Sequence, residues 1–121
     1  MANAYKRKLS GSTSGRPILI TQTSTAGPAN TIHTSVASIV DGTWDEIWLW
    51  AYNSHSSDVI LTIEFGGQDT PDQNIKITIP FQAGLIPIIP GLILQNEYIV
   101  KAFAEVGSVV TLSGFVNSIT D

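Results

Sequence analysis

The sequence has no cysteine and few charged residues, and these two absences exclude several classes of protein. Without cysteine, the chain can form no disulfide scaffold, no thiolate zinc site and no cysteine nucleophile. Charged residues make up 13% of its 121 residues, against about 25% in typical soluble domains. Because 43% of the residues are hydrophobic, the composition fits neither a disordered chain nor a nucleic-acid-binding protein.

Long hydrophobic runs are missing as well. The longest apolar stretch, Ala83–Leu94, is interrupted by prolines and glycines, and it is shorter than the ~20 residues that a membrane-spanning helix needs. The basic N-terminus is not followed by the apolar core of a signal peptide. We therefore expect one compact domain, made in a reducing compartment, with no membrane partner.

The residues that are present predict an all-β fold. The apolar segments are rich in isoleucine, valine, threonine and aromatic residues, which favour extended backbone. In Val59–Phe65 and Ile75–Ile79, apolar and polar side chains alternate, which is typical of antiparallel strands that cover a core from one side. The spacing of the turn residues predicts a single antiparallel β-sandwich, jelly-roll-like, of about eight short strands. The predicted strands are 17–23, 31–39, 44–54, 58–66, 74–80, 92–95, 97–106 and 108–117.

Basic residues are concentrated near the N-terminus. Of the net charge of −4, residues 1–16 contribute +4 and residues 17–121 contribute −8. The segment Ser10–Gly15 (SGSTSG) predicts a flexible hinge, so we expect a basic flexible arm over 1–16 and a β-sandwich domain over 17–121. Such an arm suits an acidic partner surface, although a solvated tail has the same composition, and its adjacent cations are too few for a nucleic acid partner. The basic residues of the arm are Lys6, Arg7, Lys8 and Arg16.

The strand expected at Trp44–Asn53 is apolar on both faces, so we expect both faces to be covered. All three tryptophans project from one of these faces. They either anchor a partner protein or pack beneath a loop or a neighbouring sheet. The aromatic face consists of Trp44, Trp48, Trp50 and Tyr52.

The segment Leu85–Leu94 also lacks alternation, and its two prolines are typical of a sheet edge. An uncharged apolar edge favours aggregation unless another surface covers it. We therefore predict that a contact between copies of the chain covers this edge. The predicted oligomer interface consists of Leu85, Ile86, Ile88, Ile89, Leu92 and Ile93.

The sequence contains no recognisable catalytic or metal-binding constellation. His33 and His55 are isolated, and Gly11–Gly15 has threonine at the centre of what would be a nucleophile elbow. Asp69 and Asp72 match no calcium loop. We therefore expect a protein that is not an enzyme and that needs no cofactor or metal. A carbohydrate-binding module is the alternative, in which sugars would stack on Trp48, Trp50 and Tyr52.

Five short segments together resemble a known class of structural proteins. They are Ala4–Arg7 (AYKR), Asp45–Trp50 (DEIWLW), Pro90–Leu92 (PGL), Lys101–Ala104 (KAFA) and Ser113–Asn117 (SGFVN). The class is that of small virion structural proteins of tailed bacteriophages, which decorate or cement the capsid. The resemblance implies a non-enzymatic β-sandwich, usually a homotrimer, that is made in the host cytoplasm and binds the major capsid protein on the capsid surface. Head-fibre, neck and tail adaptor proteins are similar, so these positions in the virion stay open. We assign the shell contact to the basic arm and the subunit contact to Leu85–Ile93.

Overall fold

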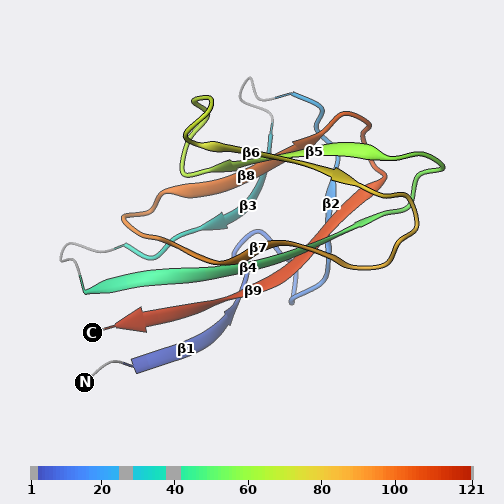
Figure 1. The fold of residues 1–121 in the computed structure, drawn as a ribbon. Helices are drawn as coiled ribbons and strands as arrows, with labels where there is room; N and C mark the ends of the chain where they lie inside the picture. The colour runs from blue at the N-terminus through green and yellow to red at the C-terminus, as the bar shows by residue number, and fades with distance from the viewer. Residues whose placement is uncertain (1–2, 25–28, 38–41, 121) are drawn as a thin grey trace.

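The computed structural model describes residues 3–24, 29–37 and 42–120, and these residues form an all-β fold (Figure 1). The strands follow the segments that are rich in β-branched and aromatic residues. Within the described ranges they are β1 (Asn3–Lys8), β2 (Ile18–Ile20), β3 (Asn30–Thr34), β4 (Thr43–Asn53), β5 (Val59–Phe65), β6 (Asn74–Ile79), β7 (Ile86–Leu94), β8 (Ile99–Ala104) and β9 (Val110–Thr120).

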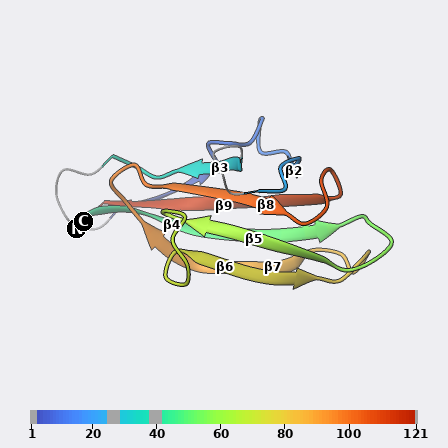
Figure 2. The same ribbon diagram turned by 90° about the horizontal axis from the view of Figure 1, so that it is seen from above.

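The strands form two antiparallel sheets that pack face to face. Sheet A has the order β1-β9-β4-β7, and β2 pairs with another part of β9; sheet B has the order β3-β8-β5-β6. In Figure 2, β8 overlies β9, β5 overlies β4 and β6 overlies β7. Apart from the β1–β2 and β5–β6 connections, each connection leads from one sheet to the other. This arrangement confirms the predicted jelly-roll-like β-sandwich.

The core lies between the sheets and follows from the alternation of side chains along each strand. In β4, Ile47 and Leu49 point toward sheet B and are almost fully buried, while the side chains between them point outward. From β5, Leu61 and Ile63 point into the same core. In β6 the alternating polar residues, such as Lys76, stay on the solvent side, whereas Thr62 and Glu64 of β5 are buried, contrary to the one-sided burial that the sequence pattern predicted.

Several strands differ in length from their predictions, and the strand predicted at 17–23 is only the three-residue β2. The strand predicted at 92–95 is the longer β7, because both of its prolines lie on an edge strand, where a missing N–H costs few ladder bonds. The register of β7 on β4 also shifts between Ile47 and Trp48 and again between Leu49 and Trp50, which accommodates the irregular backbone. The strand predicted at 31–39 is the shorter β3, and residues 38–39 lie outside the described residues.

The N-terminal segment differs from the predicted flexible arm. Residues Asn3–Lys8 form β1 and pair in register with the end of β9. The next residue, Leu9, is buried in the core, and the Gly11 N–H donates a hydrogen bond to the carbonyl oxygen of Ile32 at 2.9 Å. A Cβ on Gly11 would clash with the carbonyl oxygen of Thr31. The small residues of the supposed hinge therefore let the backbone pack closely on β3, and the structure does not show the boundary expected at residue 16.

β7 is a sheet edge, as predicted, but the residues assigned to the oligomer interface do not form one surface. Ile88 and Ile89 belong to the core, and Ile89 is only 2% exposed. Ile86 is half-buried against the same core. Even an edge strand turns alternate side chains inward, so part of this segment cannot be an interface. The exposed members are Leu85 at one end of the strand and, about 23 Å along it, Leu92 and Ile93.

Candidate functional site

The basic residues of β1 are divided between the two faces of sheet A. The register places Lys8 opposite Phe115 and Arg7 opposite Val116, whose side chain is buried in the core. Because successive side chains of a strand point to opposite faces, Lys6 and Lys8 belong to the outer face and Arg7 turns toward the inner one. The basic residues of β1, predicted to act together, therefore lie on two different faces of the sheet.

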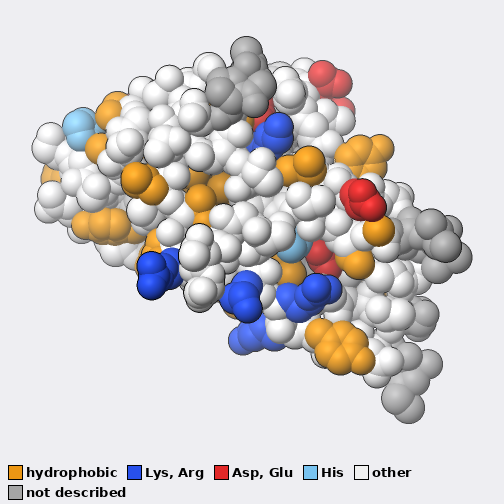
Figure 3. Space-filling model, turned by 180° about the vertical axis from the view of Figure 1, so that it is seen from behind, with side chains coloured by type: hydrophobic (Ala, Val, Ile, Leu, Met, Phe, Trp, Pro, Cys, Tyr) orange, Lys and Arg blue, Asp and Glu red, His pale blue; other side chains and the backbone are white. Residues whose placement is uncertain are grey.

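A groove of about 630 Å³ lies between β1, the loop after it and the end of β3. Figure 3 shows Lys and Arg side chains gathered along the lower side of this face of the molecule, with a histidine and a carboxylate visible just above them. We call this feature the basic groove. The charged and polar residues that matter most in its lining are Lys6, Arg7, Lys8, His33, Asp45 and Ser118.

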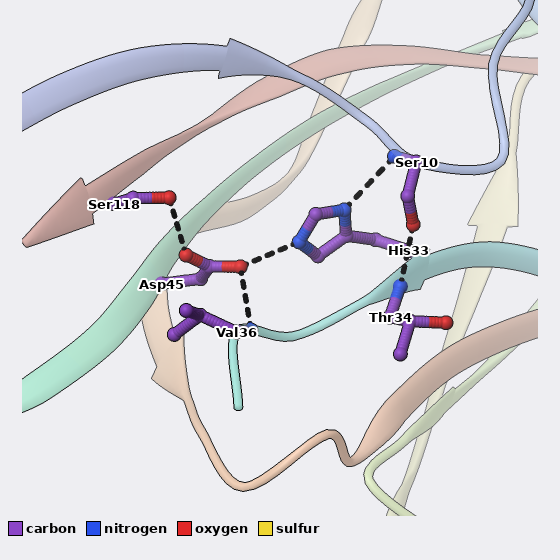
Figure 4. Close-up of polar contacts among 6 residues, drawn as sticks. All are labelled: Ser10, His33, Thr34, Val36, Asp45 and Ser118. Carbon is purple, nitrogen blue, oxygen red and sulfur yellow. Dashed lines mark hydrogen bonds and ion pairs between the residues drawn. The ribbon is translucent and has the colours of Figure 1, made fainter. Parts of the chain in front are cut away.

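The floor of the basic groove is a buried pair, His33 and Asp45 (Figure 4). His33 Nε2 lies 2.7 Å from Asp45 Oδ2, and His33 Nδ1 accepts the N–H of Ser10 at 3.0 Å. Because Nδ1 accepts, the geometry assigns the proton of the neutral imidazole to Nε2, which donates it to Asp45. Asp45 also accepts hydrogen bonds from Ser118 Oγ at 2.6 Å and from the Val36 N–H at 3.1 Å.

The surroundings of Asp45 lower the pKa of its carboxyl group. Burial alone would raise that pKa, because desolvation disfavours the charged form. The hydrogen bonds from His33, Ser118 and the Val36 N–H act in the opposite direction and together outweigh burial. The carboxylate is therefore ionised at neutral pH, and these hydrogen-bond donors stabilise its negative charge.

The same groups do not form a Ser-His-Asp catalytic arrangement. Ser118 donates to Asp45 and not to His33, while both ring nitrogens of His33 are already engaged. Ser10 Oγ accepts the N–H of Thr34 at 2.7 Å. These bonds link the loop after β1 to β3, β4 and β9. The His33–Asp45 pair therefore fixes the position of this loop at the floor of the groove.

The outer face of sheet A carries a row of aromatic rings. Phe115 of β9 lies between Trp48 and Trp50 of β4, with ring centroids 6.2 and 6.0 Å apart. Lys6 Nζ lies 4.4 Å from the centroid of the Phe115 ring, a cation–π contact. Gly91 of β7, with φ +83°, packs against Trp48, and a Cβ there would come within 2.8 Å of the indole ring. We call this surface, with its partly exposed rings, the aromatic row.

Glu46 supplies the polar side of the aromatic row. Its Oε1 accepts hydrogen bonds from Trp48 Nε1 at 2.7 Å and from Asn117 Nδ2 at 3.1 Å. These two bonds lower the pKa of Glu46. The row therefore combines flat apolar rings with an ionised carboxylate and, through Lys6, a cation.

The remaining members of the predicted aromatic face are placed differently. Tyr52 lies on the same outer side of β4, because it alternates in step with Trp48 and Trp50. Trp44 is near the other end of β4, where it lines a hollow of about 240 Å³ with Ile93 and Tyr98. The structure thus leaves the tryptophans half-buried on the outside of the sandwich and none of them in the core between the sheets.

Only the tertiary structure brings several of these residues together. Lys6 joins the aromatic row, whereas Arg16 is exposed in the loop after β1 and does not line the groove. The pairing of His33 with Asp45 was missed because 12 residues separate them and no sequence motif links them. Phe115 was missed because its place beside Trp48 depends on the β4–β9 register.

In the part of the chain that the structure describes, no three His, Cys, Asp or Glu side chains lie close enough to hold a metal ion. The same part has no helix of the length and hydropathy needed to cross a membrane. Comparison of the chain with protein-family models, with curated proteins and with solved structures gives no match.

Proposed function

We propose that this protein is a non-enzymatic structural protein of a bacteriophage virion, which binds the outside of the capsid as an oligomer and cements or decorates the major capsid protein. The observation that carries the proposal is the aromatic row on the outer face of sheet A. Trp48, Trp50 and Phe115 lie there with Lys6 over one ring. Large, partly exposed aromatic side chains beside a cation are typical anchors of a protein–protein contact.

The chemistry of this face favours a shell surface that is acidic and partly apolar. Lys6 and Lys8 extend from the same outer face as the rings, and both are exposed. Many identical copies on a particle compensate for a weak single contact. A position in a head fibre, neck or tail adaptor needs the same kind of contact, so the binding experiment has to include those structures.

Replacing Trp50 with alanine is expected to weaken binding to particles stripped of this protein by about 30-fold, because an anchor residue contributes about 2 kcal/mol. Co-sedimentation with stripped capsids measures the effect. Phe103→Ala is the matched control, since it removes a half-buried ring from the outer face of sheet B, and it should bind like the wild type. Equal binding by the two variants would show that the aromatic row is not the shell contact. Binding to isolated necks or tails instead of shells would identify an adaptor.

Carbohydrate binding by the same face is the second candidate function. The observation that favours it is the row of Trp48, Trp50 and Phe115 rings, with Glu46 and Asn117 beside it as hydrogen-bonding groups. If this function is correct, soluble oligosaccharides will change the tryptophan fluorescence in a saturable way, and Trp50→Ala will abolish the change. A fluorescence signal that stays constant during the titration contradicts carbohydrate binding and leaves the shell contact as the function of the face.

A further inference from the structure

We infer that the basic groove receives the acidic loop Asp69–Asp72 of a second copy of this chain, so that neighbouring protomers associate through unlike surfaces. The inference rests on the oligomeric part of the proposed function and names the contact within it. The supporting observation is that the basic groove and the Asp69–Asp72 loop lie toward opposite edges of the sandwich. Neither forms an ion pair with an oppositely charged side chain of another described element.

The side chain of Arg7, which turns toward the groove side of β1, lacks a carboxylate partner. It forms no ion pair with a described residue. Asp45 is the one carboxylate among the described residues of the groove lining, but its oxygens already accept three hydrogen bonds from other groups. The guanidinium of Arg7 presents donors in a planar fork that matches a carboxylate. A carboxylate from another molecule therefore fits the groove best.

The loop between β5 and β6 presents such carboxylates. Asp69 and Asp72 are exposed, and neither has an ion-pair partner among the described residues. The loop is held together by two hydrogen bonds: the Gln73 N–H donates to the Asp69 carbonyl oxygen at 2.9 Å, and the Asp69 N–H donates to Gln73 Oε1 at 3.1 Å. A loop that is ordered before binding loses less conformational entropy in the complex.

The groove and the loop lie at the same end of the strands but toward opposite lateral edges of the sandwich. β1 and β3 form one edge, whereas β6 and β7 form the other (Figure 2). The loop of a protomer therefore cannot fill the groove of the same protomer, but it can reach the groove of a neighbour. A contact between unlike edges closes a cyclic oligomer when the rotation between neighbours divides a full turn, and otherwise continues as a filament. Contact between two grooves is disfavoured, because it would bring the cations of both copies together.

Exposed apolar side chains accompany the charges on both edges. Tyr5, 60% exposed, lies on the same face of β1 as Arg7, two residues away. Near the loop, at the start of β8, Tyr98 is 57% exposed and lines a hollow of about 210 Å³ with the first residues of the β5–β6 connection. Ile93, also exposed, shares a second hollow with Tyr98. Burial of these side chains would add apolar area to the charged contact.

Charge reversal on each side of the contact tests the inference. Arg7→Glu and the double variant Asp69→Lys/Asp72→Lys are each expected to weaken self-association by about tenfold or more, as measured by sedimentation velocity on the full chain. The triple variant with all three changes should associate again, because a carboxylate in the groove then meets lysines on the loop. Arg16→Glu makes the same charge change outside the groove and should behave like the wild type.

Wild-type association should also weaken as salt rises from about 0.1 to 1 M, since the Debye length falls from ~10 to ~3 Å.

Circular dichroism and thermal melting establish first that each variant is folded, as expected for exposed positions. A monomeric wild type, single-side variants with unchanged association, or a triple variant that stays dissociated would each overturn the inference. The Trp50→Ala shell-binding assay is independent of these results. If charge reversal leaves association unchanged while Trp50→Ala abolishes shell binding, the groove contact is wrong and the proposed function stands. If reversal and restoration occur while Trp50→Ala binds shells normally, the groove contact stands and the shell contact is wrong.

Discussion

Replacing Ile89 with lysine is expected to unfold the protein. Ile89 is 2% exposed, faces Leu49 across the β4–β7 register and belongs to the core cluster. A lysine there would bury an unpaired charge and remove apolar packing, and together these effects cost several kcal/mol. Because a domain of this size is stable by only about 5–15 kcal/mol, most of the stability would be lost. The measurements are the cooperative melting transition and the β signal in circular dichroism, and both should disappear.

Ile93→Lys is the matched control on the same strand. Ile93 is 57% exposed and lies opposite Glu46 in the register, so a lysine there stays in water. The melting temperature should change by no more than a few degrees, since exposed substitutions usually alter stability by about 0.5 kcal/mol or less. If Ile89→Lys instead kept its fold and lost only its self-association, the whole of β7 would be an interface, as the sequence alone suggested.

Asp45→Asn is expected to destabilise the protein by about 2–4 kcal/mol, because each buried polar group left unsatisfied costs about 1–3 kcal/mol. The Asp45 carboxylate accepts hydrogen bonds from His33, Ser118 and Val36. An asparagine offers only one acceptor oxygen, and its NH₂ group would face a donor. Chemical denaturation at neutral pH measures the difference. Asp72→Asn, at an exposed position, is the control and should leave the stability unchanged.

The effect of Asp45→Asn is also expected to depend on pH. The pKa of Asp45 in the folded protein is below its ordinary value of 3.8, so the unfolded chain takes up a proton first as the pH falls. The stability that the carboxylate contributes is therefore complete well above 3.8 and is lost as the pH falls through this value toward the lower folded pKa. The difference in melting temperature between wild type and variant should be constant above about pH 5 and should narrow below it. An equal difference at acid and neutral pH would mean that Asp45 is not the group responsible.

Local pattern in the sequence was sufficient to predict the fold class and most of the strands. The alternation in β5 and β6 has a period of two, and this period correctly places Leu61, Ile63 and Ile79 in the core, although Thr62 and Glu64 on the other face of β5 are buried as well. The apolar residues on both sides of β4 predicted that both of its faces are covered, and in the structure one face lies in the core while the other is half-buried. These features depend only on the order of residues along one strand, which is why they are visible before any contact is known.

Only the tertiary structure decided which surfaces the side chains form. The segment predicted as a flexible arm becomes β1, because β9 offers it an edge more than 100 residues away in the sequence. The pairing of β9 with β4 places Phe115 beside Trp48 and Trp50, and the packing of β3 against β4 joins His33 to Asp45. Ile88 and Ile89 both enter the core because the register of β7 on β4 shifts at this point, which breaks the usual alternation of its side chains. Each of these outcomes depends on which strands become neighbours and in which register. Residues close together in the sequence do not determine either, because both are set by contacts between distant segments.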